Sequence, residues 1–283
     1  MSSSPLSSVE GARKSVSHRL RDLRKDAELT MQGLADLCGW NKSKVSRIES
    51  ANQTPKDADI RIWCVACGAP GQTADLIAAS RDAESMYVEW RRLQRTGLRH
   101  LQESGVPLYE RTRRFRIYAT RVMPGVLQTQ HYARALMSTI ATFRGIPDDS
   151  EDAARARVDR AQVVYQGGRS FAFVIEEDVL YKRHGSRDTM AAQLEHLLYV
   201  LPLPNVSLGV VPRAADRRTV WGQETFTMFD DTRVVVELLT AKVTVTQPSD
   251  IATYARAFAE LSQQAVHGTR AAALIRAAVD SLG

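Results

Sequence analysis

The sequence predicts two domains of different fold class: an all-α domain of five helices, then an α+β domain with a small mixed or antiparallel sheet and flanking helices. Over about the first eighty residues, apolar side chains recur at helical spacing between capping residues and glycines. From residue 115 onward, short β-branched runs occur among helical stretches without regular alternation, which favours α+β over a doubly wound fold. The length of 283 residues also suits two domains.

The expected boundaries follow from these patterns. We expect a disordered lead-in over 1–12, the helical domain over 13–82, a linker helix over 83–105 and the α+β domain over 106–283. The apolar content of 44% and the charged content of 25% are ordinary for a globular protein. No apolar run reaches the roughly 20 residues that span a bilayer, and the opening residues lack a secretory signal. We therefore expect a cytoplasmic protein without membrane contact.

The first two helices are predicted by an apolar stripe and by their caps. The stripe of the first helix consists of Val16, Leu20, Leu23 and Ala27. Thr30 suits the N-cap of a second helix, in which Leu34 and Leu37 are expected to face the core. Gly39 suits the left-handed conformation that ends a helix.

The third helix is predicted to begin after Asn41, a good N-cap residue, and to bury one face through Val45 and Ile48. Residues 57–69 and 73–82 are predicted to form the fourth and fifth helices. The other face of the third helix is left cationic and polar, with the residues Lys42, Ser43, Lys44, Ser46 and Arg47.

A face of this kind fits the major groove of double-stranded DNA. Arg or Lys donates to guanine O6 and N7, Ser bonds to several base edges and Asn suits adenine. The net charge of +6 is compatible with an anionic partner. The alternative is a solvated face on a five-helix bundle. The order of capped helix, glycine break and second capped helix favours DNA binding.

The segment from about residue 15 to residue 80 resembles the XRE/Cro-repressor type of helix-turn-helix domain. The residues that carry the resemblance are Leu20–Arg24, Leu29, Thr30, Leu34, Ala35, Gly39 and Val45–Glu49. The resemblance implies that the residues after the turn read bases, here Lys42, Ser43, Lys44 and Arg47. Asn41 joins them as a candidate DNA-binding residue because it begins the same outward face. The resemblance also implies a phosphate contact from a Gln directly after the capping Thr. Here Met31 takes that place and Gln32 follows it, so Gln32 is displaced by one position.

The same resemblance implies an ion pair between Arg24 of the first helix and Glu49 at the end of the third. We assign this pair a structural role, since it would fix the angle of the third helix. If the pair is partly buried, removal of one partner is expected to cost about 3–5 kcal/mol.

Three cysteines, an odd number, suit a reducing compartment better than a disulfide framework. Cys64 and Cys67 form a lone CxxC, and Cys38 is a third thiol whose spacing does not require it to lie nearby. A metal site would need a partner pair with ligand spacing. Positions three apart share one helix face, and cysteine packs as a small hydrophobe, so core packing is favoured. No metal and no other cofactor is expected.

The α+β domain is predicted from alternating runs. The expected strands lie within 115–119, 171–177, 205–212, 224–230, 233–239 and 242–246. Thr129 is expected to cap a helix in which Tyr132, Ala133 and Leu136 share a face, and further helices are expected within 147–166, 186–202, 250–266 and 270–282. The arginines of the linker would either extend the phosphate contacts or keep a long helix soluble. Leu197, Leu198, Val200 and Leu201 would be a dimer seam or the buried side of one helix.

This part of the chain resembles the C-terminal domain of the streptomycete WhiJ-type regulators. The resemblance is carried by residues 124–129, 132–134, 177–180, 193–194 and 204–206, with Trp90, Gly97, Leu101 and Gln102 before them. Proteins of this group are antitoxin-like regulators, typically encoded beside a small partner protein. The resemblance supplies no ligand for the domain.

Signs of catalysis are few, and we expect no enzyme. The chain has no P-loop, no GxSxG, no HExxH and no GxGxxG after a strand. The acidic trio Glu176, Glu177 and Asp178, beside His184 and Asp188, would suit a metal or acid–base work but more often forms a solvated or capping surface. Trp221, Phe226 and Phe229 would line an effector pocket or form the core of a small sheet.

The leading functional hypothesis is a sequence-specific transcription regulator associated with the nucleoid. Residues 41–50 would lie in the major groove, and the C-terminal domain would form a homodimer and receive a signal, from a small-molecule effector of unknown identity or a partner. The alternative is an antitoxin-like interaction module that holds a small partner protein encoded nearby and autoregulates the pair.

Overall fold

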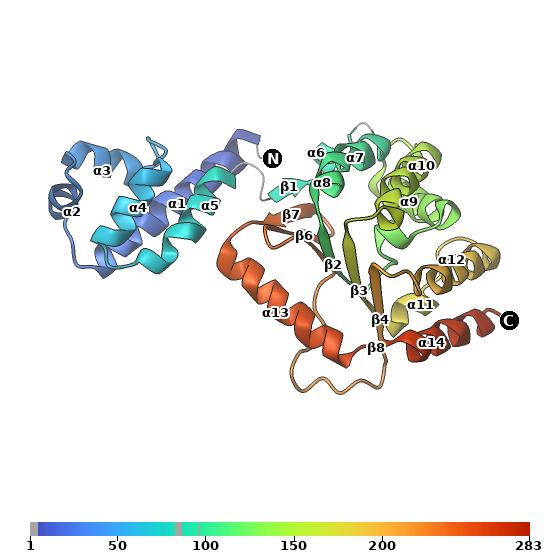
Figure 1. Cartoon of the computed structure of the whole chain (residues 1–283). Helices are drawn as coiled ribbons and strands as arrows, with labels where there is room; N and C mark the ends of the chain where they lie inside the picture. The colour runs from blue at the N-terminus through green and yellow to red at the C-terminus, as the bar shows by residue number, and fades with distance from the viewer. Residues whose placement is uncertain (1–4, 83–86, 96) are drawn as a thin grey trace. The chain divides into compact units, whose positions relative to one another are not determined.

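The computed structural model describes residues 5–82, 87–95 and 97–283, which divide into two compact units (Figure 1). The helical unit comprises Met1–Tyr87 with Thr244–Ala252, and the C-terminal unit comprises Val88–Val243 with Thr253–Gly283. Each unit has its own hydrophobic core. The predicted all-α and α+β fold classes are both confirmed.

Over residues 5–82 the helical unit contains the five predicted helices. They are α1 (Pro5–Asp26), α2 (Met31–Cys38), α3 (Lys42–Glu49), α4 (Asp57–Ala66) and α5 (Thr73–Asp82), with the 3₁₀ turn η1 (Pro70–Gln72) before α5. The Thr30 hydroxyl accepts a hydrogen bond from the Gly33 backbone N–H at 2.9 Å and so caps α2. Gly39 ends α2 at a φ of 68°, in the left-handed region that glycine adopts without strain.

The core of the helical unit lies where α1, α2, α3 and α4 meet. Its fully buried members include Leu20, Leu34, Val45, Ile48, Ile60 and Trp63. The indole N–H of Trp63 donates to the Leu20 carbonyl at 3.0 Å, so this large side chain is buried without leaving a polar atom unsatisfied. The predicted seam of α3 is therefore confirmed.

Leu37 differs from its predicted position. Leu34 is buried, but Leu37 is 62% exposed. Successive residues turn by about 100° around an α-helix, and the buried side of α2 runs through Leu34 and Ala35. Leu37 lies about 60° from Leu34 on the side away from Ala35, and so faces solvent. Three-residue spacing alone did not show on which side of Leu34 the core lies.

The predicted lead-in and linker also differ from the structure. Residues 5–12 belong to α1 instead of being disordered, and residues 1–4 lie outside the described residues. Strand β1 (Tyr87–Glu89) and the short helices α6 (Trp90–Leu93) and α7 (Arg99–Ser104) occupy the place of one linker helix. Residues 83–86 and 96 of that predicted helix lie outside the described residues.

Gly97 explains why a single helix cannot run through this segment. Its φ is 101°, and a Cβ there would lie 2.4 Å from the Asp149 carboxylate. That carboxylate accepts hydrogen bonds from the backbone N–H groups of Leu98 at 2.7 Å and Arg99 at 2.8 Å. The chain therefore turns at Gly97. Helix α7 begins after this turn, and the Asp149 carboxylate caps its N-terminal end.

A sheet of eight strands, counted over the described residues, forms the centre of the C-terminal unit. After β1 the strands are β2 (Arg114–Ala119), β3 (Ser170–Glu176), β4 (Val206–Val211), β5 (Phe226–Phe229), β6 (Arg233–Glu237), β7 (Ala241–Val245) and β8 (Val266–His267). The remaining helices are α8 (Val106–Arg111), α9 (Gln130–Arg144), α10 (Ser150–Ala161), α11 (Glu177–Tyr181), α12 (Arg187–Val200), α13 (Pro248–Gln264) and α14 (Gly268–Asp280), with the 3₁₀ turns η2 (Gly125–Leu127) and η3 (Gln162–Tyr165).

The sheet is mixed, in the order β1-β7-β6-β5-β2-β3-β4-β8. Strands β2, β3 and β4 are parallel, and the segments between them are helical, so this central part alternates strands with helices. Strand β5 runs antiparallel to β2 and β6, and β8 runs antiparallel to β4. The predicted mixed sheet is confirmed, and it is larger than the small one expected.

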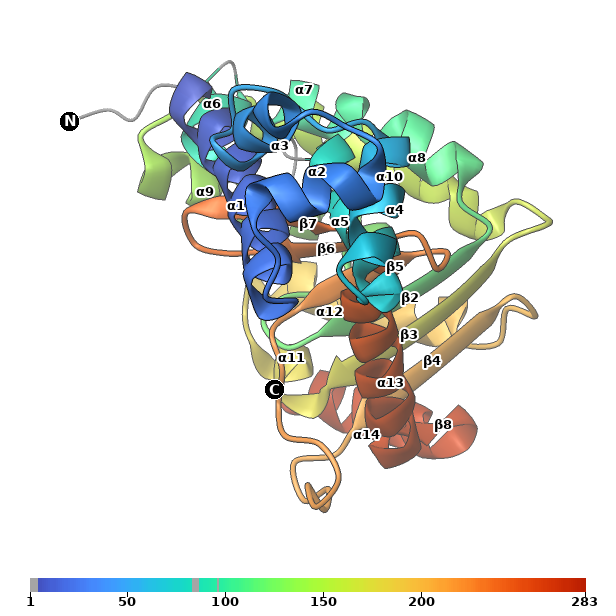
Figure 2. The ribbon, with the colours of Figure 1, turned by 90° about the vertical axis from the view of Figure 1, so that its left-hand side faces the viewer.

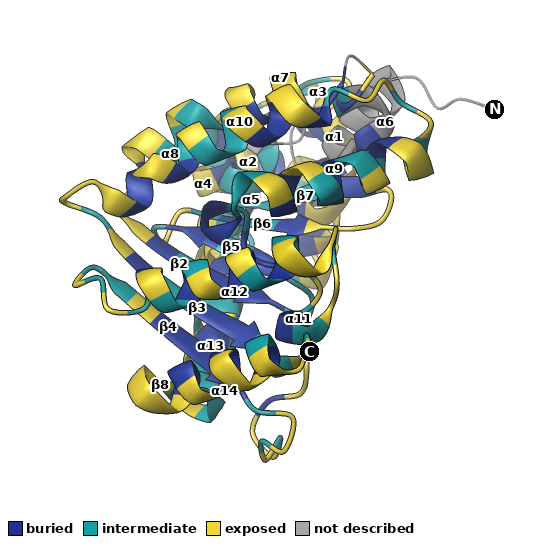
Figure 3. Ribbon diagram, turned by 90° about the vertical axis from the view of Figure 1, so that its right-hand side faces the viewer, coloured by how far each residue is buried: buried dark blue, intermediate teal, exposed yellow. Residues whose placement is uncertain are grey.

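Helices cover both faces of this sheet. Helix α13 lies against one face (Figure 2), and α9, α11, α12 and α14 lie against the other (Figure 3). On the second face Phe115, Phe171 and Phe173 from β2 and β3 pack in the larger core, with ring centroids 4.6 Å and 6.0 Å apart. On the α13 face Phe226 contacts the rings of Tyr254 and Phe258.

Two alternatives left open by the sequence are resolved by this packing. Leu197 and Val200 of α12 are buried in the core of the C-terminal unit, so this stripe is the inner side of a helix. Phe226 and Phe229 are buried, while Trp221 is 73% exposed, so the three do not line one pocket. No helix among the described residues is long and apolar enough to cross a membrane.

Candidate nucleic-acid interface

Helix α3 presents a polar face on an anchored backbone. Val45 and Ile48 are fully buried, whereas Lys42, Ser43 and Arg47 are exposed. Glu49 is the one carboxylate of the helix and is buried, so the exposed side of α3 carries positive charge and hydroxyl groups without an acidic side chain. This arrangement suits contact with an anionic surface.

Asn41 starts α3, as predicted. Its side-chain carbonyl accepts hydrogen bonds from the Lys44 backbone N–H at 2.9 Å and from the Ser43 hydroxyl at 2.7 Å. The amide NH₂ group takes no part in this cap. Asn41 and Ser43 are thus held in fixed positions at the exposed N-terminal end of the helix.

Lys44 is placed differently from the prediction that it points outward. Its ammonium pairs with the Asp59 carboxylate of α4 at 2.7 Å and lies 3.8 Å from the centroid of the Trp40 ring. Asp59 is buried and also accepts from the Lys56 backbone N–H at 3.1 Å. Lys44 therefore ties α3 to α4 and to the turn, because its charge is attracted by both a carboxylate and a ring face.

Arg47 and Gln32 are exposed and have polar neighbours within the domain. The Arg47 Nε donates to the Gln53 side-chain oxygen at 3.0 Å, and the Gln53 backbone N–H donates to the Arg47 carbonyl at 3.0 Å. Gln32 donates to the Asp36 carboxylate at 2.7 Å, one helical turn along α2. Both side chains are accessible, and each contact is a single surface hydrogen bond that a nucleic acid could replace.

The expected pair of Arg24 and Glu49 is present in the structure. Arg24 Nε lies 2.5 Å from Glu49 Oε1, and Arg24 Nη2 lies 3.0 Å from Glu49 Oε2. Both residues are buried, and Arg24 Nη1 also donates to the Leu29 carbonyl at 2.6 Å. The hydrogen bond with Glu49 raises the pKa of Arg24. The pair joins the end of α1 to the end of α3, and so fixes the direction of the exposed face.

The three cysteines are free thiols. Cys64 is fully buried, and Cys38 and Cys67 are half-buried beside the core of the helical unit. Burial, with smaller effects from Cys38 and Cys64, raises the pKa of Cys67 to about 11. The Cys67 thiol therefore stays protonated near neutral pH. Among the described residues, no group of three His, Cys, Asp or Glu side chains is placed to hold a metal ion.

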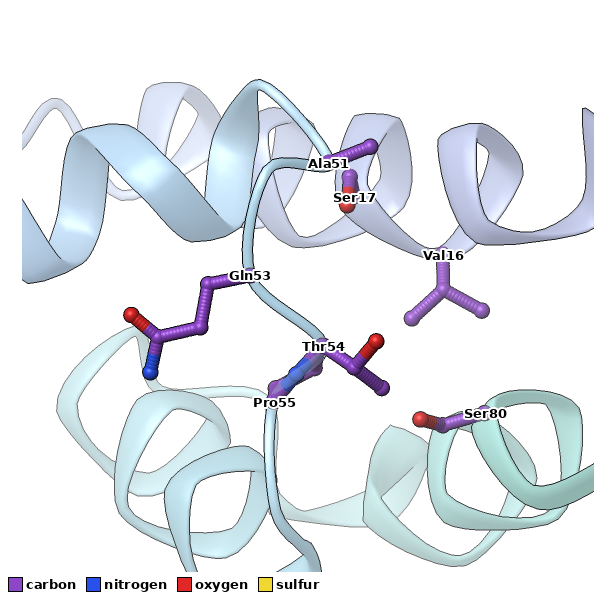
Figure 4. Close-up of a pocket in the computed structure, with 7 residues that line it drawn as sticks. All are labelled: Val16, Ser17, Ala51, Gln53, Thr54, Pro55 and Ser80. Atoms are coloured by element: carbon purple, nitrogen blue, oxygen red, sulfur yellow. The ribbon is translucent and has the colours of Figure 1, made fainter. Parts of the chain in front are cut away.

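A cavity of about 10 Å³ lies between α1, the loop after α3 and α5, lined by Val16, Ser17, Ala51, Gln53, Thr54, Pro55 and Ser80 (Figure 4). A volume of this size holds about one water molecule. It is a packing gap, too small for a ligand.

The acidic trio of the C-terminal unit is engaged by arginines. Glu176 pairs with Arg217 and accepts from the Tyr118 hydroxyl at 2.6 Å. Asp178 pairs with Arg213 at 2.5 Å. Glu177 accepts from the Arg213 backbone N–H at 2.8 Å, so the trio joins the segment after β4 to the end of β3, and two of its carboxylates meet arginines of the protein itself.

The comparisons with known proteins agree with this division. Residues 106–277, more than half of the chain, match a family model described as "Domain of unknown function (DUF5753)". The chain belongs to the DUF5753 family. Residues 2–77 match a model described as "Helix-turn-helix domain", which confirms the predicted helix-turn-helix at the N-terminus of this DUF5753 protein. The narrower XRE and WhiJ-type groupings stay predictions.

Among solved structures, the chain is similar to TrmBL2, an archaeal chromatin protein whose structure shows a novel mode of DNA binding. The identity is 12%, the match covers 85% of this chain and 88% of that chain, and the TM-score is 0.31. A likeness at this level supports no conclusion about this chain. Among curated proteins the DUF5753 protein has no match.

Sequence reasoning missed the partners of two predicted contact residues. Asp59 was not recognised as the anchor of Lys44, and Gln53 was not recognised as the neighbour of Arg47. One signal was available for Asp59. It is the third residue of α4, where a carboxylate that accepts from the N-terminal backbone is common.

Proposed function

We propose that this protein is a sequence-specific DNA-binding regulator in which α3 enters the major groove. The exposed side of α3, with Asn41, Lys42, Ser43 and Arg47, carries this proposal. These side chains supply donors of the kind that read base edges, and they stand on a helix whose orientation is fixed by the pair of Arg24 and Glu49. Lys44 has a supporting role, because Asp59 and Trp40 hold its ammonium.

Phosphate contacts would come from the start of α2. The first backbone N–H groups of a helix and its dipole favour an anion. Thr30 uses its hydroxyl to cap Gly33, so the neighbouring N–H groups and the exposed Gln32 remain for a phosphate. Contacts of this kind fix register on the duplex, and the side chains of α3 would supply the sequence preference.

In this proposal the protein acts as a homodimer in the cytoplasm, on the nucleoid, and performs no catalysis. Two copies would address half-sites about 34 Å apart, or a multiple of that spacing. The C-terminal unit would join the copies and receive the signal, as in the WhiJ-type regulators it resembles. A palindromic site near the protein's own promoter, found by mapping bound genomic fragments, would supply the operator for the tests.

The deciding experiment compares Arg47→Ala with the parent on operator and scrambled duplexes. If Arg47 reads a guanine, the substitution should cost about 1–3 kcal/mol on the operator and relax specificity at one base position. Arg19→Ala is the matched control. Arg19 is an exposed arginine of the same domain that donates to the Gln72 side chain on η1 and, among the described residues, has no hydrogen bond or ion pair with α3. Operator affinity and base preference that are equal in Arg47→Ala and the parent would contradict the proposal.

A second candidate function is an antitoxin-like module that holds a small partner protein. Exposed apolar side chains on the C-terminal unit favour it. Phe143 is 73% exposed and Leu239 is 69% exposed. The side chain of Arg144, the residue after Phe143, donates to the Leu239 carbonyl at 3.3 Å and so links the two segments. Leu239→Asp should abolish co-purification with the product of an adjacent gene while operator binding is retained. If co-purification is unchanged, this surface does not bind the partner protein.

A further inference from the structure

The C-terminal unit contains a cavity of about 340 Å³ that none of the functions above requires. It lies among α7, α8, α9, α10 and the strands β5, β6 and β7. Figure 1 shows these helices gathered at one end of the sheet. Apolar side chains form part of the wall, among them Leu98, Leu108, Met137 and Phe229. The volume is within the range of small-molecule sites in proteins.

The rest of the wall is strongly cationic. Six basic side chains line it, against one carboxylate, that of the exposed Glu237; they are Arg111, Arg144, Arg157, Arg160, Arg233 and Lys242. Within the described part of the chain, no ion pair of 4.0 Å or less joins any of these six cations to a carboxylate. The cavity therefore has a large excess of positive charge.

Neutral glutamines orient the arginines. The side-chain oxygen of Gln102 accepts from Arg157 Nε at 3.1 Å and from Arg160 Nη2 at 3.1 Å. Gln128 accepts from Arg157 Nη1 at 2.6 Å, and Gln94 accepts from Arg144 Nη1. Each of these glutamines is only 4% exposed. A buried amide oxygen fixes the direction of a guanidinium and leaves its charge uncompensated.

Aromatic rings hold two of the same arginines. The Arg160 guanidinium lies 4.5 Å from the Tyr109 ring centroid, and that of Arg144 lies 4.9 Å from the Trp90 ring centroid. The ring face attracts a cation without neutralising it. The Arg160 Nε is buried and has no hydrogen-bond partner among the residues that the structure describes. The guanidiniums are thus aligned while one donor remains unused.

The like charges in this arrangement repel one another, and the single Glu237 carboxylate offsets only part of that repulsion. Burial lowers the pKa of Arg157 to about 10, with the charge of Arg160 adding to the effect. Burial also lowers the pKa of Lys242. Placing like charges close together in a shielded site costs free energy, and a bound carboxylate or phosphate would recover it through paired, charge-assisted hydrogen bonds.

We propose that this cavity binds a small organic anion, whose carboxylate or phosphate oxygens meet Arg144, Arg157 and Arg160 and whose apolar part packs on the cavity wall. The site is separate from the DNA-binding face and does not depend on it. Gln102 and Trp90, which carried part of the resemblance in the sequence, have roles here as the residues that orient the arginines.

The test uses the full chain with two probes, inorganic pyrophosphate and citrate, by isothermal titration calorimetry and thermal unfolding at constant ionic strength. Saturable binding of one probe per chain, with a melting temperature that rises with probe concentration, is expected for at least one of them. The probe that binds more tightly identifies phosphate or carboxylate chemistry. If neither probe binds beyond the effect of sodium chloride at equal ionic strength, the proposal is overturned.

Gln102→Glu localises the site without changing side-chain volume. The new carboxylate would pair with Arg157 and Arg160 from inside, so the melting temperature without probe should be unchanged or higher, and probe affinity should fall at least tenfold. Arg155→Gln is the control, because Arg155 is an exposed arginine on the same helix, α10, and does not line the cavity. Parent-like affinity in Gln102→Glu, or an equal loss in Arg155→Gln, would contradict the assignment.

Discussion

Arg24 of the helical unit, which is buried, and Arg157 of the C-terminal unit, which is half-buried, are held in opposite ways. In the helical unit Arg24 meets the Glu49 carboxylate through two hydrogen bonds. In the C-terminal unit the hydrogen-bond acceptors of Arg157 within the described residues are the amide oxygens of Gln102 and Gln128. A carboxylate neutralises the charge of an arginine within the protein. An amide oxygen orients the guanidinium but leaves its positive charge free to attract a bound anion. The pair of Arg24 and Glu49 therefore stabilises the fold, whereas the arrangement around Arg157 suits the binding of an anion.

The largest effect is expected for breaking the pair in the helical unit. Arg24→Met leaves Glu49 buried without its cation and should destabilise the unit by about 3–5 kcal/mol. Urea unfolding, followed by the fluorescence of Trp40 and Trp63, measures the change. DNA binding should weaken with it, since the direction of α3 depends on this pair.

The double variant Arg24→Met, Glu49→Leu separates charge from packing. Replacing both partners of a buried pair by apolar residues is often close to neutral for stability. The double variant should therefore recover most of the lost free energy of unfolding. If Arg24→Met alone is as stable as the parent, another group must neutralise the charge of Glu49. That result would contradict the difference proposed here between the two units.

The next largest effect is expected for Lys44, which lies on the candidate DNA-binding helix but forms an ion pair with Asp59 of α4. Lys44→Met removes the partner of the buried Asp59 and should cost about 1–3 kcal/mol of stability. Lys42→Ala is the matched control, because Lys42 is an exposed lysine on the same helix and should affect DNA affinity more than stability. Reversed results, with stability lost in Lys42→Ala and only DNA affinity lost in Lys44→Met, would show that Lys44 leaves Asp59 when DNA binds.

These differences also show which features of the fold and of the candidate site the sequence could predict. The helices of the first unit were predictable because their signals are local. Thr30, Gly39 and Asn41 act on backbone groups within one turn of themselves. The strand segments of the C-terminal unit were predictable for the same reason, from β-branched runs.

Contacts between distant residues were not predictable. Lys44 and Asp59 are fifteen positions apart, and nothing local distinguishes Lys44 from its exposed neighbour Lys42. The arginine and glutamine cluster joins residues from several helices, 29 to 58 positions apart. The pair of Arg24 and Glu49 was expected only through a family resemblance. A single sequence shows the charges but not which of them the fold brings together.

A smaller effect is expected when one glutamine of the cavity is made acidic. Gln94→Glu would give Arg144 a carboxylate and so copy the arrangement of the helical unit in the C-terminal one. A charge-assisted hydrogen bond is roughly twice as strong as a neutral one, so we expect a gain of about 1 kcal/mol in the free energy of unfolding. Gln193→Glu is the control, because Gln193 is also buried but donates to the Leu127 carbonyl and has no arginine partner among the described contacts. It should destabilise. If Gln94→Glu lowers the free energy of unfolding as much as the control does, the charge of Arg144 is already neutralised by another group.

The smallest effect is a difference in acid sensitivity between the units. Burial lowers the pKa of His196 below its ordinary value of 6.5. Burial and the charge of Lys182 do the same for the pKa of His184. The unfolded chain then takes up these protons more readily than the folded one, so stability is complete above about pH 6.5 and falls as the pH drops towards the lowered values. His18, the histidine of residues 1–87, is exposed.

Urea unfolding at pH 7.5 and 5.5 measures this loss. His196→Gln should reduce the loss of stability on going to pH 5.5, whereas His131→Gln, at an exposed position of α9, should leave it unchanged. The effect should follow the transition of the C-terminal unit, because both shifted histidines belong to that unit. If the helical unit loses as much stability over this range, carboxylates and not these histidines control the acid response, and the units do not differ in this respect.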